Sequence, residues 1–534
     1  MVDDVTNAQN EAADEVYAFP ASSAQQRLWF LDQLESGTAV YSIPQALRLR
    51  GAIDRAVLER ALREIVVRHE SLRTTFAAPE GDPLQVVHPE PDLRFGVQSV
   101  ASLPESEREA EARRLVQVEA ERAFDLAEGP LFRAGLIELA EGDAVLWLNV
   151  HHIVCDGWSL ALLYEELSAL YGAFAQGKAS PLEEVPIQYA DYALWQREIF
   201  QGEALDKEIA YWKSALAPQG SSAPVLELPT DRVRPPTPTI RGDQKSFAVS
   251  RELSDRIAAL GKSESASLFQ TLLSAFYVWL HRVSGQSEIL VGSPVAHRER
   301  AELEKAIGFY TNTVVFRGEL GGEPSFRELV RRTQKSVLAG LAHQDLPFER
   351  VVEAVQPNRG AGFHPLFQAM FAVQRAPESA LALPGVRAEL WNVHPRTSKF
   401  DVLLEMQEVS SGLQCFFEYN TDLFDEATAA RFVESFLVLL EAAASAPDTS
   451  IEALPMLSEA GRKQQLVDWN ATEAELPPKC VHELVAEQAA RTPEAVAVRF
   501  EGSELRYGEL ERRSNQLARL LAERGVEPGA RVGV

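Results

Sequence analysis

Two adjacent histidines followed by an aspartate and a glycine are the residues of this chain best suited to catalysis. They lie in the stretch from Asn149 to Ser159, which reads N-V-H-H-I-V-C-D-G-W-S. Asp156 follows His152 at a distance that, with Gly157 directly after it, chance produces in roughly one such chain in a thousand. An imidazole has a reference pKa of about 6.5, so near pH 7 it accepts a proton or a hydrogen bond from a substrate amine. The motif therefore predicts acid–base or positioning chemistry at a histidine.

The apolar run before the motif predicts how the two rings are oriented. Residues Ala144 to Val150 alternate as in a strand, and extending this alternation places His151 and His152 on opposite faces. Only one ring then reaches a common reaction centre, and the pair makes a poor metal chelate. The pattern predicts one ring for chemistry and one for support.

Elements on both sides position the motif. Leu131 to Leu139 and Ala144 to Val150 predict an antiparallel hairpin, and the apolar stripe from Leu160 to Phe174 predicts a helix that stops at Gly177. This helix would begin close to Asp156, so its N-terminal amides add positive potential near the histidines. Each residue also has a structural interpretation: a single buried histidine usually belongs to a core, and an aspartate before a helix is usually its cap.

Composition excludes several classes of partner. The chain has 534 residues, 46% of them hydrophobic, so it is long enough for about three domains. Its formal charge of -26 argues against nucleic acid or an anionic membrane as a partner, because phosphates would be repelled. Three widely spaced cysteines do not form a disulfide framework. With no signal peptide and no apolar span long enough to cross a bilayer, we expect a cytoplasmic protein.

A second α/β pattern follows a proline-rich segment. Residues 218–238 contain six prolines and are interpreted as an extended crossover between two bodies. The expected organisation is a flexible lead-in (1–17), a first lobe (18–180), a second lobe (181–457) that includes the crossover, a linker (458–476) and a third segment (477–534). That last segment carries two short amphipathic helices and ends in an apparent strand, Arg531 to Val534.

Several ordered motifs resemble the condensation domain of non-ribosomal peptide synthetases. The resemblance covers about Phe19 to Leu457 and includes the double-histidine motif. The other stretches that carry it are Ser22 to Trp29, Arg68 to Phe76, Tyr189 to Trp195, Gly308 to Thr313, His343 to Glu349 and, more loosely, Asn358 to Leu366.

The resemblance implies a fold and partners. The family fold is α/β, with two lobes similar to chloramphenicol acetyltransferase that form a V-shaped pseudo-dimer around a central tunnel. The domain itself is expected to bind no cofactor or metal. It joins a donor acyl group to an acceptor amino acid, each carried as a thioester on the phosphopantetheine arm of a donor or an acceptor peptidyl carrier protein.

The end of the chain resembles the beginning of a synthetase adenylation domain. The matching stretches are His482 to Leu484, Thr492 to Ala497, Leu505 to Leu510, Asn515 to Ala518 and Gly525 to Gly529. The family's Ser/Thr/Gly-rich phosphate loop is not among them, so this piece is not expected to activate an amino acid. The adjoining adenylation domain is a further expected partner.

The resemblance also implies roles for the motif residues. His152 is expected to accept the proton of the attacking amine or to hydrogen-bond it, with both roles open, while His151 packs behind the loop. Gly157 would let a pantetheine arm approach closely, since a side chain there crowds the tunnel. Asp156 would be structural and paired with an arginine, with Arg68 as first choice and Arg73 as second.

Five further residues are expected along the tunnel from their motif positions alone. One of them, Ser159, has an equally simple interpretation as a helix-start residue without contact to substrate. The expected tunnel residues are Trp158, Ser159, Tyr310, Asn312 and Ser398.

Other functions share part of these motifs. An epimerisation domain has the double histidine, but Trp158-Ser159 and the adenylation start argue against it. A heterocyclisation domain would carry aspartates in place of the histidines, and a coenzyme A acyltransferase would lack the flanking motifs. A catalytically idle docking platform remains an alternative. A starter domain with a fatty acyl donor is another, although the stretches Ser22 to Leu31 and Tyr41 to Leu49 look more like those of domains that take an aminoacyl or peptidyl donor. The sequence leaves donor, acceptor and subtype open.

Overall fold

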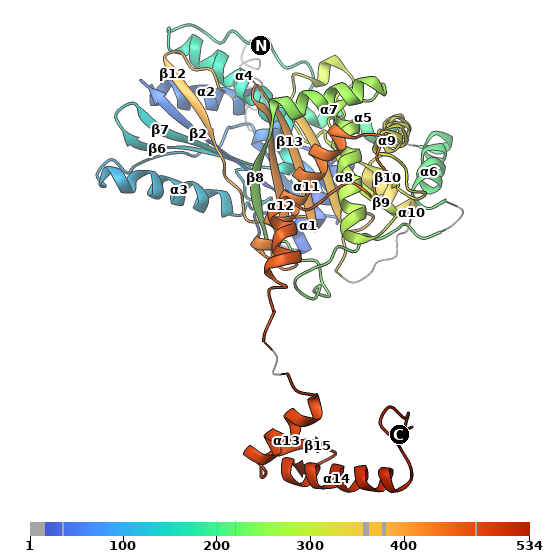
Figure 1. The fold of residues 1–534 in the computed structure, drawn as a ribbon. Coiled ribbons are helices and arrows are strands. Elements are labelled where there is room, and N and C mark those ends of the chain that lie inside the picture. Colours follow the sequence, from blue (N-terminus) through green and yellow to red (C-terminus); the bar gives the residue numbers. More distant parts are fainter. Residues whose placement is uncertain are drawn as a thin grey trace, which may run out of the picture. The chain divides into compact units, whose positions relative to one another are not determined.

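The computed structural model divides the chain into two compact units, Met1–Ser458 and Glu459–Val534, which are described separately (Figure 1). The residues that the structure describes are 16–34, 37–199, 201–218, 221–355, 362–375, 381–475 and 478–533. Most of the predicted lead-in (1–17) therefore lies outside the described residues, and so does part of the loosely matching motif at 358–366.

The first lobe of the larger unit is built on a five-stranded sheet with the order β12-β2-β7-β6-β5. The strands are β2 (Ser42–Gly51), β5 (Phe95–Ser99), β6 (Phe132–Ala140), β7 (Asp143–His151) and β12 (Val386–Trp391). Helices α2 (Arg55–Arg68) and α4 (Gly157–Phe174) cover one face of the sheet, and α3 (Glu105–Glu121) covers the other (Figure 1). Strands β6 and β7 form the predicted hairpin, in which Ala140 pairs with Asp143.

Alternate side chains of β7 point to opposite faces of the sheet, so this strand contributes to two hydrophobic cores. Leu146, Leu148 and Val150 are buried against α2 and α4, whereas Val145 and Trp147 are buried on the side of α3. This confirms the alternation predicted from the sequence, and it fixes the direction in which the end of the strand presents its last side chain.

A smaller sheet and short helices complete the first lobe. Strands β1 (Tyr17–Pro20), β4 (Leu84–Val87) and β3 (Thr74–Ala77) form an antiparallel sheet. Helix α1 (Ser23–Leu34), the 3₁₀ turn η1 (Glu70–Arg73) and helix α5 (Tyr189–Ile199) lie near it.

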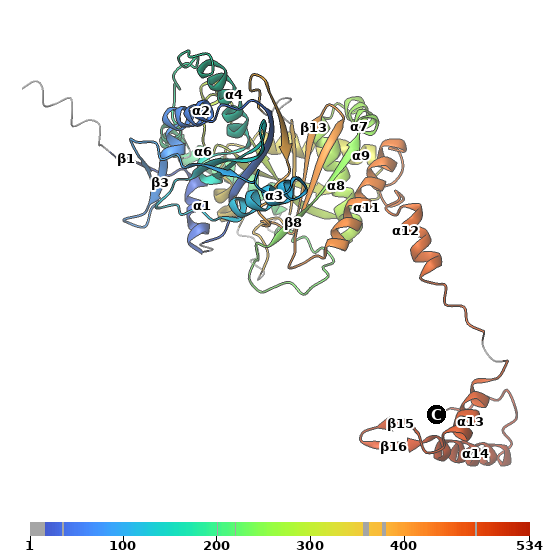
Figure 2. The ribbon, with the colours of Figure 1, turned by 90° about the vertical axis from the view of Figure 1, so that its left-hand side faces the viewer.

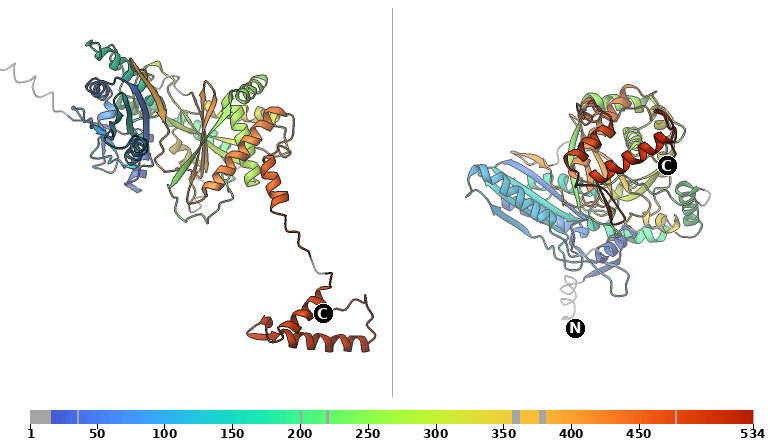
Figure 3. Two further views of the ribbon diagram at one scale, coloured as in Figure 1. Left: turned by 60° about the vertical axis from the view of Figure 1, so that its left-hand side comes forward. Right: turned by 60° about the horizontal axis from the view of Figure 1, so that its bottom comes forward.

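The second lobe is built on a six-stranded sheet with the order β10-β9-β11-β13-β14-β8. Its strands are β8 (Gly242–Ser250), β9 (Glu288–Val295), β10 (Asn312–Glu319), β11 (Ala369–Arg375), β13 (Val402–Val409) and β14 (Gly412–Asn420). Its helices are α6 (Gly202–Leu216), α7 (Arg251–Ser263), α8 (Leu268–Ser284), α9 (Phe326–Leu341), α10 (Phe348–Val355) and α11 (Glu426–Ser445). Figure 2 and the left view of Figure 3 show α7, α8 and α11 along one side of this sheet. The prediction of two mixed α/β lobes is confirmed.

Two connections between the lobes differ from the prediction. Strand β12 falls within the range expected for the second lobe, yet it pairs with β2 of the first, with Val386 opposite Gly51. The proline-rich stretch 218–238 is not the crossover, because α6 already buries Trp212 and Leu216 in the core of the second lobe. The chain crosses earlier, between α5 and α6, and the prolines then run along the second lobe, where Leu226 and Leu228 join the same core.

The smaller unit contains three helices, a π-helical turn and a hairpin within its described residues. They are α12 (Glu459–Lys463), η5 (Gln464–Asp468), α13 (Val481–Arg491), β15 (Val496–Phe500), β16 (Ser503–Arg506) and α14 (Tyr507–Glu523). The strand predicted at 531–534 is wrong for the part that is described, since residues 531–533 have no strand partner. Across the described part of the chain, no helix combines the length and apolar character that crossing a bilayer requires.

Candidate active site

The double histidine lies where β7 ends and a 3₁₀ turn (His152–Val154) leads into α4. The backbone N–H of His152 donates to the carbonyl oxygen of Tyr41 over 2.8 Å, which fixes the end of the strand. His151 is buried edge-on against Tyr41 and Phe124, with ring centroids 6.3 and 5.8 Å away. Its Nδ1 accepts the N–H of Ile153, so this ring supports the loop and does not reach the cavity.

The ring of His152 points the other way, into a cavity between the lobes. Its Nδ1 lies 3.0 Å from the carbonyl oxygen of Cys155, and its ring packs edge-on against Phe309 at 4.8 Å. Since a carbonyl oxygen only accepts, Nδ1 must carry the proton, which leaves the lone pair on Nε2. Burial, reinforced by the charge of Lys399, lowers the pKa of His152 to about 4. The ring is therefore neutral at pH 7 and presents a hydrogen-bond acceptor.

The cavity has a volume of about 1,400 Å³ and is lined by both lobes. His152, Gly157 and Trp158 belong to its first-lobe wall, as expected for all three. A Cβ on Gly157 would meet only the Oε1 of Gln374, at 3.8 Å, so the surrounding protein atoms do not themselves demand glycine. Trp158 donates from its indole N–H to the carbonyl oxygen of Glu304 in the second lobe.

Asp156 fastens the motif loop to the second lobe. Its carboxylate is fully buried and caps α4 by accepting the N–H of Ser159 over 2.8 Å. The same carboxylate accepts the N–H groups of Tyr310 and Thr311 at 2.9 and 3.2 Å, and a guanidinium N–H of Arg298 at 3.2 Å. Asp156 is thus a structural group that joins the start of α4 to residues more than 140 positions later in the chain.

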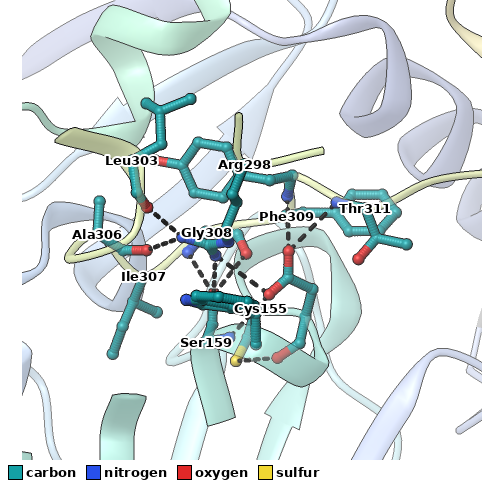
Figure 4. A network of polar contacts seen from close by, with 12 residues as sticks. Cys155, Ser159, Arg298, Leu303, Ala306, Ile307, Gly308, Phe309 and Thr311 are labelled. Atoms are coloured by element: carbon teal, nitrogen blue, oxygen red, sulfur yellow. Dashed lines mark hydrogen bonds and ion pairs between the residues drawn. The ribbon is translucent and has the colours of Figure 1, made fainter. Parts of the chain in front are cut away.

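Arg298 organises the other side of this contact. Its guanidinium donates to the hydroxyl of Ser159 over 2.7 Å and to the carbonyl oxygens of Ala306 and Leu303 (Figure 4). Ser159 in turn donates to the carbonyl oxygen of Gly308 and accepts its N–H. The serine is buried in this network and does not line the cavity, so its interpretation as a helix-start residue is the correct one.

The predicted arginine partners of Asp156 are wrong. Arg68 forms an ion pair with Glu166 of α4, which also binds His69 at 2.9 Å. Arg73 donates to the carbonyl oxygen of His88 and lies 3.5 Å from Glu70. Both arginines find carboxylates or carbonyls within their own lobe, whereas Asp156 faces the second lobe.

Like Ser159, three more of the predicted tunnel residues do not line the cavity. Tyr310 is buried in an aromatic cluster, with the guanidinium of Arg298 over its ring at 4.1 Å. Asn312 donates its amide to the carbonyl oxygens of Gln344 and Leu346, and Ser398 donates its hydroxyl to that of Phe400. Asn312 and Ser398 bind backbone carbonyl groups and Tyr310 packs among aromatic rings, so motif position alone misassigned them.

Sequence reasoning missed two charged residues at the site. Arg298 lies in the run His297 to Arg300, which has no motif of its own. Lys399 lies directly after Ser398 and lines the cavity. Lys399 lies in a bend before β13, so no helix or strand period could have indicated that it faces the cavity. Among the described residues, no group of histidine, cysteine or carboxylate side chains is arranged to hold a metal ion.

Comparison with known proteins identifies the family. The family model described as "Condensation domain" matches residues 16–467, and the model described as "AMP-binding enzyme" matches residues 485–534. One of the linear gramicidin synthase subunits from Brevibacillus parabrevis is 46% identical over 532 residues, which cover 99% of this chain and 10% of that protein. The dimodular nonribosomal peptide synthase of Bacillus subtilis (strain 168) is 39% identical over 533 residues, 97% of this chain and 22% of that protein.

Solved structures agree with this result. The X-domain from teicoplanin biosynthesis superimposes with a TM-score of 0.73 at 28% identity, over 82% of this chain and 97% of that one. A four-domain nonribosomal peptide synthetase bound to AMP and glycine superimposes with a TM-score of 0.82 over 96% of this chain and 39% of that one; at 24% identity it shows the fold alone. The chain spans about a tenth of the length of the gramicidin synthase subunits it matches. It belongs to the condensation-domain family, the amide-forming acyltransferases of non-ribosomal peptide synthetases, and continues into the beginning of an AMP-binding domain.

Proposed function

We propose that this domain joins a carrier-bound acyl donor to a carrier-bound aminoacyl acceptor, with His152 at the reacting amine. The observation that carries the proposal is the tautomer of His152. Its Nδ1–H donates to the carbonyl oxygen of Cys155, and its Nε2, which has no hydrogen-bond partner among the described residues, belongs to a ring that lines the cavity between the lobes. An acceptor of this kind orients the lone pair of the incoming amine toward the thioester carbonyl.

The reaction forms one bond and breaks another. The amine nitrogen attacks the thioester carbon, the C–N bond forms, the C–S bond breaks, and the donor pantetheine leaves as its thiol. The proton lost by nitrogen is the one gained by sulfur. With a pKa of about 4, His152 is too weak a base to deprotonate an ammonium group efficiently, so the structure favours a role in holding the neutral amine and stabilising charge on its nitrogen.

The arms that deliver the substrates are phosphopantetheine groups of donor and acceptor carrier proteins. A cavity of about 1,400 Å³ has room for two thioester-bearing arms that meet at His152. Gly157 belongs to this wall, where a larger side chain would occupy space that an arm needs.

The polar lining favours an aminoacyl or peptidyl donor over a fatty acyl donor. Glu405 and Glu418 project from β13 and β14 into the cavity, and Glu165 and Lys399 also line it. A hydrocarbon chain placed against these groups would remove them from water without replacing their hydrogen bonds, which is unfavourable. A peptide-like group offers amides and an amine to the same walls.

A second candidate is a platform that binds carriers or a tailoring enzyme without catalysis. The similarity to an X-domain that has been crystallised in complex with OxyB favours it. The presence of a neutral His152 with a free acceptor nitrogen favours catalysis instead.

The test is His152→Ala, assayed by mass spectrometry of the acceptor carrier after mixing loaded donor and acceptor carriers. Loss of general acid–base or positioning groups of this type lowers rates by about 10²–10⁴-fold. His343→Ala is the matched control, because His343 binds Glu208 and stacks on Tyr211 away from the cavity. Undiminished product from His152→Ala would overturn the proposed role, and carriers that bind a domain forming no product with any loaded pair would support the platform.

A further inference from the structure

Lys399 is a charged residue in the cavity wall that the mechanism above does not use. It follows the buried Ser398 in the segment that enters β13, and its half-buried side chain lines the cavity. Its amine lies 4.8 Å from the centroid of the Tyr41 ring, in the first lobe. The residue therefore reaches from the second lobe to the face that carries the histidine motif.

Among the residues that the structure describes, this ammonium has no counter-ion at hydrogen-bond distance. Within the described ranges, no carboxylate lies within ion-pair distance of Lys399, and no carbonyl or hydroxyl oxygen accepts from it. The carboxylate whose charge favours its protonated form, Glu418, is hydrogen-bonded at 3.0 Å to His394. A cation removed from bulk water and left without a partner is unfavourable, so its retention in a substrate cavity points to a partner that arrives with the substrate.

Tyr41 connects the lysine to the reaction centre. Its backbone oxygen accepts the N–H of His152 over 2.8 Å, while its ring lies beneath the ammonium of Lys399. The positive charge of Lys399 also lowers the pKa of both His151 and His152, because it repels a proton on either ring. The lysine and His152 thus contribute to the same part of the cavity from different lobes.

The intermediate of thioester aminolysis needs two different partners. Attack makes the nitrogen positive and the former carbonyl oxygen negative. An imidazole acceptor suits the N–H side, and an ammonium donor suits the oxygen side. No other residue assigned to this mechanism supplies a positive charge for that oxygen.

We propose that the ammonium of Lys399 binds the carbonyl oxygen of the donor thioester and stabilises the negative charge that develops there when the acceptor amine attacks. The inference rests on the proposed function and assigns a further catalytic residue to it. The electron pair of the C=O bond moves onto oxygen as the C–N bond forms, and it returns when the C–S bond breaks. Lys399 keeps its proton throughout.

The charge of Lys399 must then be present for the reaction. Burial lowers the pKa of its amine to about 8, so the charge is lost as the pH rises above that value. The charged or titratable groups that influence it are Glu418 on β14, Arg27 on α1, and His151 and His152 at the end of β7. Since the attacking amine becomes more reactive as pH rises, a fall in rate above about pH 8 has the sign expected for loss of the lysine charge and not for the amine.

The experiment compares Lys399→Met, Lys399→Gln and Lys399→Arg with wild type in the full chain. The substrates are carrier proteins loaded with aminoacyl-phosphopantetheine, screened beforehand for a pair that wild type condenses. We expect Met and Gln to lower kcat by about 10²-fold or more, as loss of an oxyanion donor does, with smaller changes in KM. We expect Arg to retain most of the rate and to lose the fall above pH 8, because a guanidinium stays charged.

Several outcomes separate this inference from the proposed function. Folded Met or Gln variants that react within threefold of wild type would overturn the role of Lys399 while His152→Ala still tests the histidine. A decline above pH 8 that persists unchanged in Lys399→Arg would also overturn it. If Met and Gln variants melt at lower temperature, the pH profile of Lys399→Arg decides. Wild type that forms no product with any loaded pair would refute the proposed function itself.

Discussion

The two walls of the inter-lobe cavity are built in different ways. The first-lobe wall comes from α1, from residues 40–44 at the start of β2, and from the stretch between His152 and Glu165 at the end of β7 and the start of α4. The second-lobe wall is assembled from strands β9, β11, β13 and β14 and the loops between them. The part of the first wall that carries the histidine can be recognised as a motif because its residues are neighbours in sequence. The second exists only after the sheet has formed.

The difference shows how the site is held together. The first wall supplies the imidazole, and the second supplies Lys399 and the anchor for Asp156. Arg298 and the N–H groups of Tyr310 and Thr311 all come from the second lobe, so the position of the histidine loop depends on both lobes.

The largest effect on stability is expected from breaking this anchor. Asp156→Ala leaves Arg298 charged and buried with one partner fewer, which should lower the free energy of unfolding by about 3–5 kcal/mol. Urea denaturation measures this loss. The double variant Asp156→Ala/Arg298→Met should be no less stable than Asp156→Ala alone if the two residues act as a pair. If the losses of the two single variants instead add up in the double variant, the residues are not coupled.

A smaller effect is expected from enlarging the first-lobe wall. Gly157→Val adds a branched side chain at a position where a Cβ touches only Gln374, so the fold should tolerate it. If an arm passes there, kcat/KM for a loaded carrier should fall about tenfold or more, corresponding to about 1.4 kcal/mol of lost transition-state binding. Gly172→Val on the same helix, outside the cavity wall, is the control. Equal rates for Gly157→Val and wild type would show that the arm does not pass Gly157.

The burial of both histidines predicts a pH dependence of stability. Their pKa values are lowered to about 3 for His151 and about 4 for His152, so below about pH 6.5 the unfolded chain binds protons that the folded chain does not. Stability should therefore fall as the pH drops from 6.5 toward 4, by at most about 1.4 kcal/mol per pH unit for each ring. His152→Gln should flatten the slope relative to wild type in denaturation curves at pH 6.5, 5.5 and 4.5. Parallel slopes would mean that His152 is not held neutral.

The smallest effect is expected at a residue of the second lobe that the motif wrongly placed in the tunnel. Ser398→Ala removes one hydrogen bond to the carbonyl oxygen of Phe400 and should cost about 0.5–1.5 kcal/mol of stability. Condensation should proceed at close to the wild-type rate, measured with the same loaded carriers. A hundredfold lower condensation rate with an unchanged melting temperature would indicate that Ser398 acts in the active site.

Sequence reasoning succeeded where the signal was local. The hairpin before the motif and the helix after it follow from periodicity within a few residues. The two rings diverge as predicted, but the 3₁₀ turn that begins at His152 separates them, because the strand ends at His151. The partner of Asp156 could not be found in that way, because Arg298 lies 142 residues away and is brought close only by contact between lobes. Lys399 was missed for a related reason: it lies in a bend before β13, where no helix or strand period predicts which side chain faces the cavity.

Strand β12 has a consequence for how far the cavity can widen. The chain leaves the second-lobe sheet after β11, adds β12 to the outer edge of the first-lobe sheet, and returns to enter β13. The two lobes are thus joined by the backbone hydrogen bonds between β12 and β2 as well as by side chains. Small pivoting about this connection is compatible with the pairing, but full separation would break six backbone pairs with β2. For the same reason, a polypeptide cut after residue 180 would leave the first lobe with a bare sheet edge, prone to recruit another chain.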